Sequence, residues 1–394
     1  MSNTKTWCVN AFHALTVNTD GSAKTCCMAT SDIPEKKVRV YKLTELFNDT
    51  HLEKIRDDLD QGIRNSNCDR CWEEEDAGRK SKRLRDNEHY EFQDTKSLRI
   101  LELNLGNTCN IKCRTCSPWN SSQWIKEKYE IEKPNVSYGS FLSRFKVLHE
   151  SFDDDALMWE SLEEILPNLV QMDFYGGEPF LIKKQWNIIR IAVKEGYSKN
   201  LKVHYNTNGT IWNEDQIALL SDMRIADVSI SADGVGDRFE YMRNLAKWPV
   251  VHDHISKAIE WRKDNQNVVL TLCYTISILN VWYINEIVEY GDLHGINVYL
   301  NLVHSPSHYN IQNIPDDIKI KIETHLRETI PSTHSSWYWL TGIIAFMHQK
   351  SYNPADWESF LKTTKIHDDY RNEDYKKTFS EFYNVISHHT NNLL

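Results

Sequence analysis

The sequence lacks any long hydrophobic run. Its apolar stretches have the length of strands, roughly five to eight residues, and are too short to span a bilayer. The first ten residues, MSNTKTWCVN, also lack the basic start and apolar stretch of a secretory signal. We therefore expect a cytoplasmic protein with no membrane partner.

Positive charge is also scarce. Over 394 residues, 46 Lys and Arg stand against 56 Asp and Glu, which gives a formal net charge of −10. This balance argues against a protein that coats duplex nucleic acid, although it leaves a local basic groove open. One basic cluster, residues 79–85, is interpreted as a solvated helix or linker that could still bind a phosphate or an acidic partner.

The nine cysteines are distributed unevenly, with eight of them before residue 117. In a cytosolic chain, clustered cysteines indicate metal or redox chemistry rather than disulfides. The ninth, Cys273, stands alone in an apolar run, where we expect a free buried thiol.

Three regions follow one another along the chain: 1–92, 97–304 and 305–394. The first holds five cysteines, a hairpin predicted around Asp20-Gly21 and a helix predicted over 43–63. The last is predicted to be a helical extension, with helices over 315–329 and 353–388. In the middle region, strands alternate with helices and predict a parallel sheet. The predicted strands are 99–105, 170–175, 202–206, 227–231, 268–275 and 297–303.

Glycine and asparagine follow several of these strands, which places loops at their carboxyl ends. In barrels and open α/β sheets, binding sites form at that edge. On the first strand, Glu102 and Asn104 alternate with leucines. We expect both to point into the barrel, as candidates for substrate contacts.

Three cysteines follow the first predicted strand, with the spacing C-x3-C-x2-C: Cys109, Cys113 and Cys116. A zinc site would normally need a fourth Cys or His ligand, and none is adjacent. Three thiolates instead suit a cubane iron–sulfur cluster in which one iron lacks a protein ligand. That iron would be open to a small molecule.

This motif, after the first strand of a six-strand array, resembles the signature of the radical S-adenosylmethionine (SAM) superfamily. A second shared element, the segment 176–179 after the next strand, resembles the family's backbone shelf for the amino group of SAM. Further matches are Asn208 after the third strand, Ser229 and Ser231 at the end of the fourth strand, and Arg243 a little further along the chain. The cofactor-binding residues that the resemblance implies are Gly176, Gly177, Glu178, Pro179, Asn208, Ser229, Ser231 and Arg243.

The resemblance implies an α/β fold with a partial (β/α)6 TIM-like barrel over 97–304. It also implies an enzyme that cleaves SAM reductively at a [4Fe–4S] cluster and forms a 5′-deoxyadenosyl radical, which abstracts hydrogen from a substrate. The favoured substrate is a peptide or protein; a nucleotide, nucleic acid or small metabolite is the alternative. An electron donor such as flavodoxin or ferredoxin would be a partner. A non-catalytic iron–sulfur electron-transfer or binding protein is a different class, against which the intact segment 176–179 argues.

The remaining cysteines lie in the first region. The predicted hairpin would bring Cys8 near Cys26 or Cys27, and the helix over 43–63 would return the chain to Cys68 and Cys71. Four thiolates would then meet at one place, with Cys26 or Cys27 to spare. Both a four-cysteine zinc site and a second iron–sulfur cluster stay open.

This arrangement resembles the auxiliary-cluster modules of the SPASM and twitch type, found on many radical SAM enzymes that modify peptides and proteins. The shared features are a D-G-x4-C-C hairpin, a helix and a closing C-x2-C. In those families the module usually follows the barrel, whereas here it precedes it. The resemblance implies a cysteine-rich N-terminal module with one auxiliary [4Fe–4S] cluster.

Overall fold

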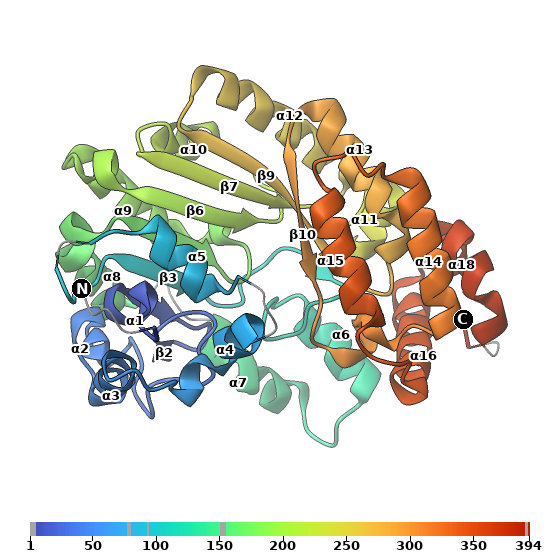
Figure 1. The fold of residues 1–394 in the computed structure, drawn as a ribbon, viewed down its shortest axis with the longest axis horizontal. Helices are drawn as coiled ribbons and strands as arrows, with labels where there is room; N and C mark the ends of the chain where they lie inside the picture. The colour runs from blue at the N-terminus through green and yellow to red at the C-terminus, as the bar shows by residue number, and fades with distance from the viewer. Residues whose placement is uncertain (1–4, 77–79, 93, 150–154, 391–392) are drawn as a thin grey trace.

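The computed structural model describes residues 5–76, 80–92, 94–149, 155–390 and 393–394. Strands run across the middle of the molecule, with the N-terminal helices at the lower left and the C-terminal helices at the right (Figure 1). The sheet has eight strands in the order β10-β9-β7-β6-β5-β3-β1-β2. The strands are β1 (Ala14–Val17), β2 (Ala23–Lys24), β3 (Ile100–Asn104), β5 (Gln171–Tyr175), β6 (Lys202–Thr207), β7 (Ile225–Ser231), β9 (Val268–Ile276) and β10 (Asn297–Leu302).

All strands of this sheet except β2 are parallel to their neighbours. The six strands of the middle region lie within two residues of their predicted bounds, so the predicted fold class, an α/β partial barrel with a helical C-terminal extension, is confirmed. Five helices alternate with these strands: α8 (Ala156–Ile165), α9 (Lys183–Lys194), α10 (Glu214–Leu220), α12 (Trp248–Asp264) and α13 (Ile284–His294).

The N-terminal region supplies a further strand to the sheet. β1 pairs in parallel with β3, and Leu15 lies opposite Leu101. The predicted hairpin forms between β1 and β2, and Gly21 at its turn has a φ of 82°, which favours glycine. The first region therefore shares hydrogen bonds and a hydrophobic core with the barrel. That a domain boundary lies between residues 92 and 97 stays a prediction.

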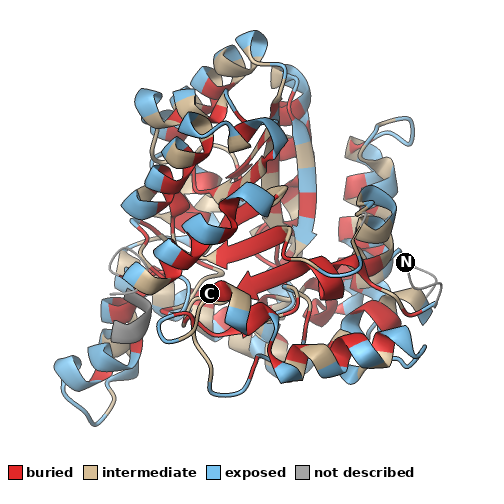
Figure 2. Cartoon of the chain, turned by 90° about the vertical axis from the view of Figure 1, so that its left-hand side faces the viewer, coloured by how far each residue is buried: buried red, intermediate tan, exposed pale blue. Residues whose placement is uncertain are grey.

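Side chains alternate between the two faces of the sheet. On the outer face, the ring of Phe174 stacks on Tyr205 at 4.7 Å, and Tyr205 stacks on Trp186 of α9 at 5.7 Å. The buried side of each helix faces the strands, as Figure 2 shows. The inner face is polar: Glu102, Asp173, His204 and Asp227 lie side by side on four neighbouring strands. Glu102 thus points inward, as predicted.

The N-terminal helices are shorter than predicted. The single helix expected over 43–63 is wrong, because the chain breaks at Asn48-Asp49 and the Asp49 side chain caps a new helix by accepting a hydrogen bond from the His51 amide. The helical elements of this region are α1 (Val9–His13), α2 (Leu43–Phe47), α3 (Thr50–Asp60), η1 (Ser66–Cys68), α4 (Asp69–Asp76) and α5 (Lys82–His89).

The C-terminal extension is also divided more finely than predicted. The helix expected over 353–388 ends at Arg371, because Asn372 adopts a left-handed φ of 55° that terminates it. The elements here are α14 (Asp316–Thr329), α15 (Trp337–His348), α16 (Pro354–Arg371), α17 (Tyr375–Thr378), α18 (Ser380–Ile386) and η8 (Ser387–His389).

Shorter elements complete the barrel region. Two helices, α6 (Trp124–Glu132) and α7 (Tyr138–His149), fill the connection between β3 and α8. The remaining pieces are β4 (Lys112–Cys113), η2 (Leu166–Asn168), η3 (Pro179–Leu181), η4 (Tyr197–Asn200), α11 (Asp237–Met242), β8 (Arg243–Asn244), η5 (Val281–Tyr283), η6 (Ser307–Tyr309) and η7 (Ile311–Asn313). Within the described ranges, no helix has both the length and the apolar character to cross a bilayer.

Candidate iron–sulfur and cofactor site

The loop with three cysteines begins at the carboxyl end of β3 and folds over the mouth of the barrel. Its short strand β4 pairs antiparallel with β8, which places Cys113 opposite Arg243. The amide of Arg114 donates to the Met242 carbonyl at 2.8 Å and extends this pairing. Cys109 and Cys113 are buried, Cys116 is half-buried, and all three are free thiols.

Two polar side chains approach the sulfurs of this loop. Arg243 Nη1 donates to Cys113 Sγ at 3.7 Å, and Asn208 Nδ2 donates to Cys109 Sγ at 3.8 Å. The Asp233 carboxylate lies 2.9 Å from Arg243 Nη2 and holds the guanidinium in place. A hydrogen bond from Cys116, helped by the charge of Arg243, lowers the pKa of Cys113 despite its burial, whereas burial raises the pKa of Cys109 to about 11.

Gly176 and Gly177 bring the end of β5 directly against the cysteine loop. Their φ angles are 81° and 42°, and a Cβ on Gly177 would lie only 2.1 Å from the Thr108 carbonyl oxygen. The next amide, that of Glu178, donates to the same oxygen at 2.8 Å. The two glycines therefore let the loop and the strand end pack backbone to backbone, which no side chain would permit.

Glu178 ties two strand ends together. Its buried carboxylate accepts hydrogen bonds from Thr207 Oγ1 at 2.7 Å, from the Asn208 amide at 2.7 Å and from the Phe180 amide at 3.1 Å. Burial raises the pKa of this carboxyl, and the three donors oppose that rise. Both oxygens are thus engaged within the chain, and a contact between this segment, including Pro179, and a cofactor stays a prediction.

The other predicted cofactor residues lie at neighbouring strand ends. Asn208 follows β6 and donates to Asn110 Oδ1 of the cysteine loop at 2.9 Å. Ser229 and Ser231 occupy the carboxyl half of β7 on its inner face. The structure therefore gathers the segment 176–179, Asn208 and Arg243 around the three cysteines, with the two serines on the adjacent strand.

Cys273 differs from its prediction as a buried thiol of an apolar run. It is only half-buried and lies on the inner face of β9, where its Sγ is 3.9 Å from Asn206 Oδ1. Its neighbours Leu272 and Tyr274 face the helices instead. Side chains alternate between the two faces of β9, so Cys273 lies on the polar inner face although its neighbours in the sequence are apolar.

The C-terminal extension supports the cysteine loop through a buried charge network that the sequence did not reveal. Arg114, next to Cys113, forms ion pairs with Asp368 and Glu373, and its side chain is fully buried. Tyr241 donates to Asp368 at 2.7 Å. Asn244 of β8 donates to Glu373 at 2.6 Å, so both strands of the β4–β8 pair are fixed to the C-terminal region.

A second cluster of charges continues this contact. Glu127 of α6 lies 2.6 Å from Lys112, 2.9 Å from Arg371 and 2.8 Å from His367. Burial would raise the pKa of Glu127, but the hydrogen bond from His367 and the charges of Arg371 and Lys112 hold it at about 2. Helix α16 thereby supports the loop through Glu127 and Lys112.

A second set of thiols meets in the N-terminal region, from four different elements. Cys8 precedes α1, Cys26 follows β2, Cys68 ends η1 and Cys71 lies in α4; all four line one small cavity. Cys27 is exposed and separate from this set, and its amide donates to Glu102 Oε2 at 2.8 Å. The structure thus distinguishes Cys26 from Cys27, which the sequence could not do.

The electrostatics of this second set are less favourable to thiolates. Burial raises the pKa of Cys8 to about 11 and that of Cys68 to about 12, and also raises that of Cys26. Lys82 and Arg83 are the cations that line the same cavity. Arg83 is buried and paired with Glu75, so the interpretation of residues 79–85 as a solvated helix or linker is wrong for this residue. Position 79 itself lies outside the described residues.

The spacing of the sulfurs bears on the kind of metal group. Four thiolates around one zinc at 2.3 Å would stand about 3.8 Å apart. Among the described residues, the group of three or more ligand atoms that lie within 4.8 Å of one another is Asp317, His388 and His389, on the C-terminal surface. Within the described residues, neither cysteine set forms a group of this kind.

Comparison with known proteins identifies the middle of the chain. Residues 103–291 match the sequence profile of the radical SAM superfamily. No curated protein matches the chain significantly by sequence. Solved structures with a similar arrangement include anSMEcpe with bound AdoMet, at 17% identity and a TM-score of 0.39, over 70% of this chain and 62% of that one.

Two structures of SuiB from Streptococcus suis are also similar. The form bound to S-adenosylmethionine has 12% identity and a TM-score of 0.38, over 71% of this chain and 59% of that one. The form bound to the precursor peptide SuiA has 10% identity and a TM-score of 0.36, over 89% and 69%. At these values the structural likenesses carry no inference, and the chain spans less than two thirds of anSMEcpe. By the match to the family profile, residues 103–291 of the chain are a radical SAM domain.

Proposed function

We propose that this protein binds a [4Fe–4S] cluster through Cys109, Cys113 and Cys116 and uses it to cleave SAM reductively. The observation that carries this proposal is the convergence of three thiols, two sulfur-directed donors and the glycine pair at one mouth of the barrel. A cluster bound here would supply the electron that splits SAM into methionine and a 5′-deoxyadenosyl radical.

The residues of the chain have separate tasks in this proposal. The three cysteines hold the cluster and leave one metal position open to SAM. Gly176 and Gly177 let the backbone approach closely, and their carbonyls are candidates to receive the ammonium group of SAM. Arg243 balances the charge of Cys113. Ser229 and Ser231 are candidates for the ribose and carboxylate groups.

The N-terminal thiols Cys8, Cys26, Cys68 and Cys71 are proposed to hold an auxiliary [4Fe–4S] cluster. Their convergence in one cavity supports a shared metal group. The resemblance of this region to SPASM and twitch modules supports a peptide or protein as the substrate. A reduced flavodoxin or ferredoxin is the proposed electron donor, and the cytoplasm is the proposed compartment.

The test is SAM cleavage by the full chain after anaerobic reconstitution. With dithionite, wild-type protein is expected to release 5′-deoxyadenosine slowly even without substrate, and to carry about eight iron and eight sulfide, as for two cubanes. Replacing Cys109, Cys113 and Cys116 together by Ala should abolish cleavage and remove about half of the iron. Cys27→Ala, at a thiol outside both sets, is the matched control. Cleavage at the wild-type rate by the triple variant would refute the assignment.

A further inference from the structure

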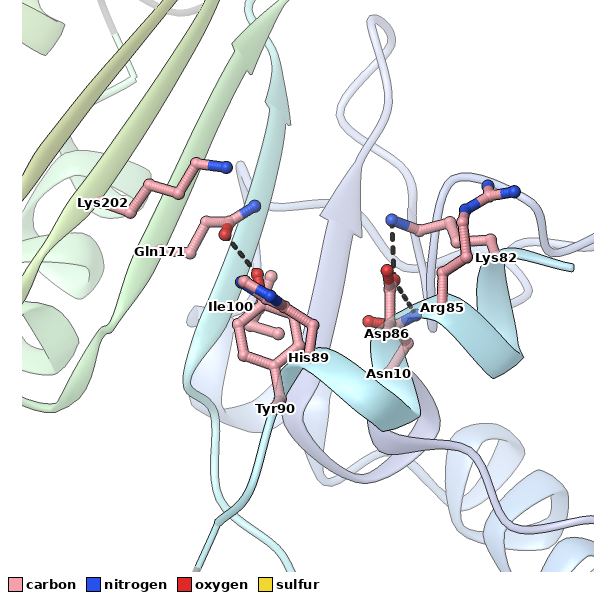
Figure 3. A pocket seen from close by; sticks show the side chains of 9 residues that line it. All are labelled: Asn10, Lys82, Arg85, Asp86, His89, Tyr90, Ile100, Gln171 and Lys202. Carbon is pink, nitrogen blue, oxygen red and sulfur yellow. Dashed lines mark hydrogen bonds and ion pairs between the residues drawn. The ribbon is translucent and has the colours of Figure 1, made fainter. Parts of the chain in front are cut away.

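A pocket of about 360 Å³ lies beside helix α5 (Figure 3). It is at the amino-terminal ends of β3, β5 and β6, whereas the cysteine loop follows the carboxyl end of β3. One wall is formed by the first inner-face residues of three strands, Ile100, Gln171 and Lys202, which stand opposite one another in the sheet. The other wall comes from the N-terminal region, chiefly helix α5. It consists of Asn10, Lys82, Arg85, Asp86, His89 and Tyr90.

The lining of this pocket carries surplus positive charge. Its lining cations are Lys82, Arg85 and Lys202, and the carboxylate among its described lining residues is Asp86. Just outside the lining, Glu102 lies 3.4 Å from Lys82 and Asp227 lies 3.1 Å from Lys202. Asp86 is already engaged, at 3.0 Å by Lys82 and at 2.7 Å by Asn10 Nδ2. Among the described residues, Arg85 has no ion pair, and its guanidinium donates to the Lys80 carbonyl at 2.9 Å. In a chain of net charge −10, Arg85 is thus a cation of the lining that no described carboxylate pairs with.

The position of the pocket relates it to the cysteine loop. Strand β6 begins at Lys202 in the pocket and leads to Asn208, whose amide group touches Cys109 Sγ. At about 3.3 Å per residue, these two positions are about 20 Å apart, a distance that about six residues of extended peptide would span. The pocket is therefore placed to hold one end of a substrate whose other end reaches the cofactor site.

We propose that this pocket binds a carboxylate or phosphate group of the substrate. The guanidinium of Arg85 and the ammonium of Lys202 would form charge-assisted hydrogen bonds with its oxygens. A peptide would present an acidic side chain about six residues from the residue that reacts, and a small metabolite would present a phosphate. The link to the reaction rests on the proposed function, whereas anion binding itself does not.

Calorimetric titration of the full chain tests the proposal. The probes are inorganic phosphate, the capped peptide Ala-Glu-Ala and its neutral counterpart Ala-Gln-Ala. Wild-type protein should bind phosphate or the Glu peptide but not the Gln peptide. The double variant Arg85→Gln and Lys202→Gln should weaken that binding at least tenfold, and Lys194→Gln, at an 82% exposed side chain of α9, should not change it.

The outcomes separate the possible sources of the anion. Binding of the Glu peptide alone indicates an acidic peptide, and binding of phosphate alone indicates a phosphorylated metabolite; both support the pocket. Binding of neither probe, or equal binding by the double variant, overturns the proposal. Because Lys202 also pairs with Asp227 at 3.1 Å, Arg85→Gln alone serves if the double variant is unfolded. Deoxyadenosine release is measured in parallel, so failure of the pocket and failure of the proposed function remain distinct.

Discussion

The two cysteine sets differ in how the chain assembles them. Cys109, Cys113 and Cys116 lie on one loop of eight residues, which is held between strand ends and the C-terminal charge network. Cys8, Cys26, Cys68 and Cys71 come from four elements that meet only when the N-terminal region is folded. The first site is a local motif set on a rigid frame, whereas the second depends on tertiary structure.

The sets also differ in their charged neighbours. At the first, Arg243 donates directly to a sulfur, and the pKa of Cys113 is lowered. At the second, burial dominates and raises the pKa of three thiols, although Arg83 opposes the rise at two of them. A metal group bound at the proposed second site would therefore have to stabilise more of the thiolate charge, and we expect more of its binding energy to contribute to folding.

The largest expected effect separates Cys26 from Cys27. Cys26→Ala removes one of four convergent thiols and should lose the N-terminal metal group, about half of the total iron, while 5′-deoxyadenosine formation continues. Cys27→Ala should keep all of the iron, because this residue lies outside the cavity. Iron and sulfide analysis after anaerobic reconstitution measures both. If the two variants retain equal iron, the division between these adjacent cysteines is wrong.

The next effect tests the rigid frame of the first site. Gly177→Ala would place a Cβ 2.1 Å from the Thr108 oxygen in a left-handed backbone, and should cost about 4 to 5 kcal/mol of unfolding free energy together with the cluster at Cys109, Cys113 and Cys116. Gly62→Ala is the control, since Gly62 has a φ of 78° with no atom within 4 Å of the added Cβ. It should cost only about 1 kcal/mol. Equal losses in urea unfolding would show that backbone conformation, not close packing, is decisive.

The sequence predicts the first site well because its parts are local. The three thiols, the strand before them and the glycines after the next strand each follow from short patterns. The two charge-network residues Arg114 and Asp368 are 254 positions apart and read as ordinary surface charges. No short pattern shows that β1 pairs with β3, because either strand of the hairpin could have formed the hydrogen bonds to the sheet. Likewise, the hairpin places Cys26 and Cys27 near Cys8, but only the folded chain shows which one faces it.

The third effect tests the C-terminal support of the first site. Arg114→Met leaves Asp368 and Glu373 without their buried cation and should cost about 3 kcal/mol of unfolding free energy. Lys126→Met is the control, because its ion pair with Glu130 is exposed and 3.7 Å long, and should cost less than about 0.5 kcal/mol. Urea unfolding measures both, and iron content shows whether the loop still holds its cluster. A loss below about 1 kcal/mol for Arg114→Met would show that the buried charge network does not support the first cysteine site.

The smallest effect concerns Asp173, which lies inside the barrel between the two cysteine regions. Burial raises the pKa of this carboxyl from 3.8 to about 6, and Glu102 raises it further, while His204, Lys82 and Gln171 oppose the rise. Because the folded-state pKa lies above the unfolded value, the native state binds the proton more tightly. Stability from this group is therefore fully present below pH 4 and is lost as the pH rises through 6.

Asp173→Asn removes that ionisation and should stabilise the protein by about 2 to 3 kcal/mol at pH 7.5, but by only about 1 kcal/mol at pH 4.5. The amide keeps one acceptor for Gln171 Nε2, which lies 2.8 Å from Asp173 Oδ1. Asp60→Asn, at an exposed carboxylate that ends α3, should change stability by less than about 0.5 kcal/mol at either pH. Urea unfolding at the two pH values gives the difference. A gain in stability that is the same at both pH values would mean that Lys82 and His204 already compensate the charge of Asp173. Because Lys82 comes from the N-terminal region, that region and the barrel would then be electrostatically coupled.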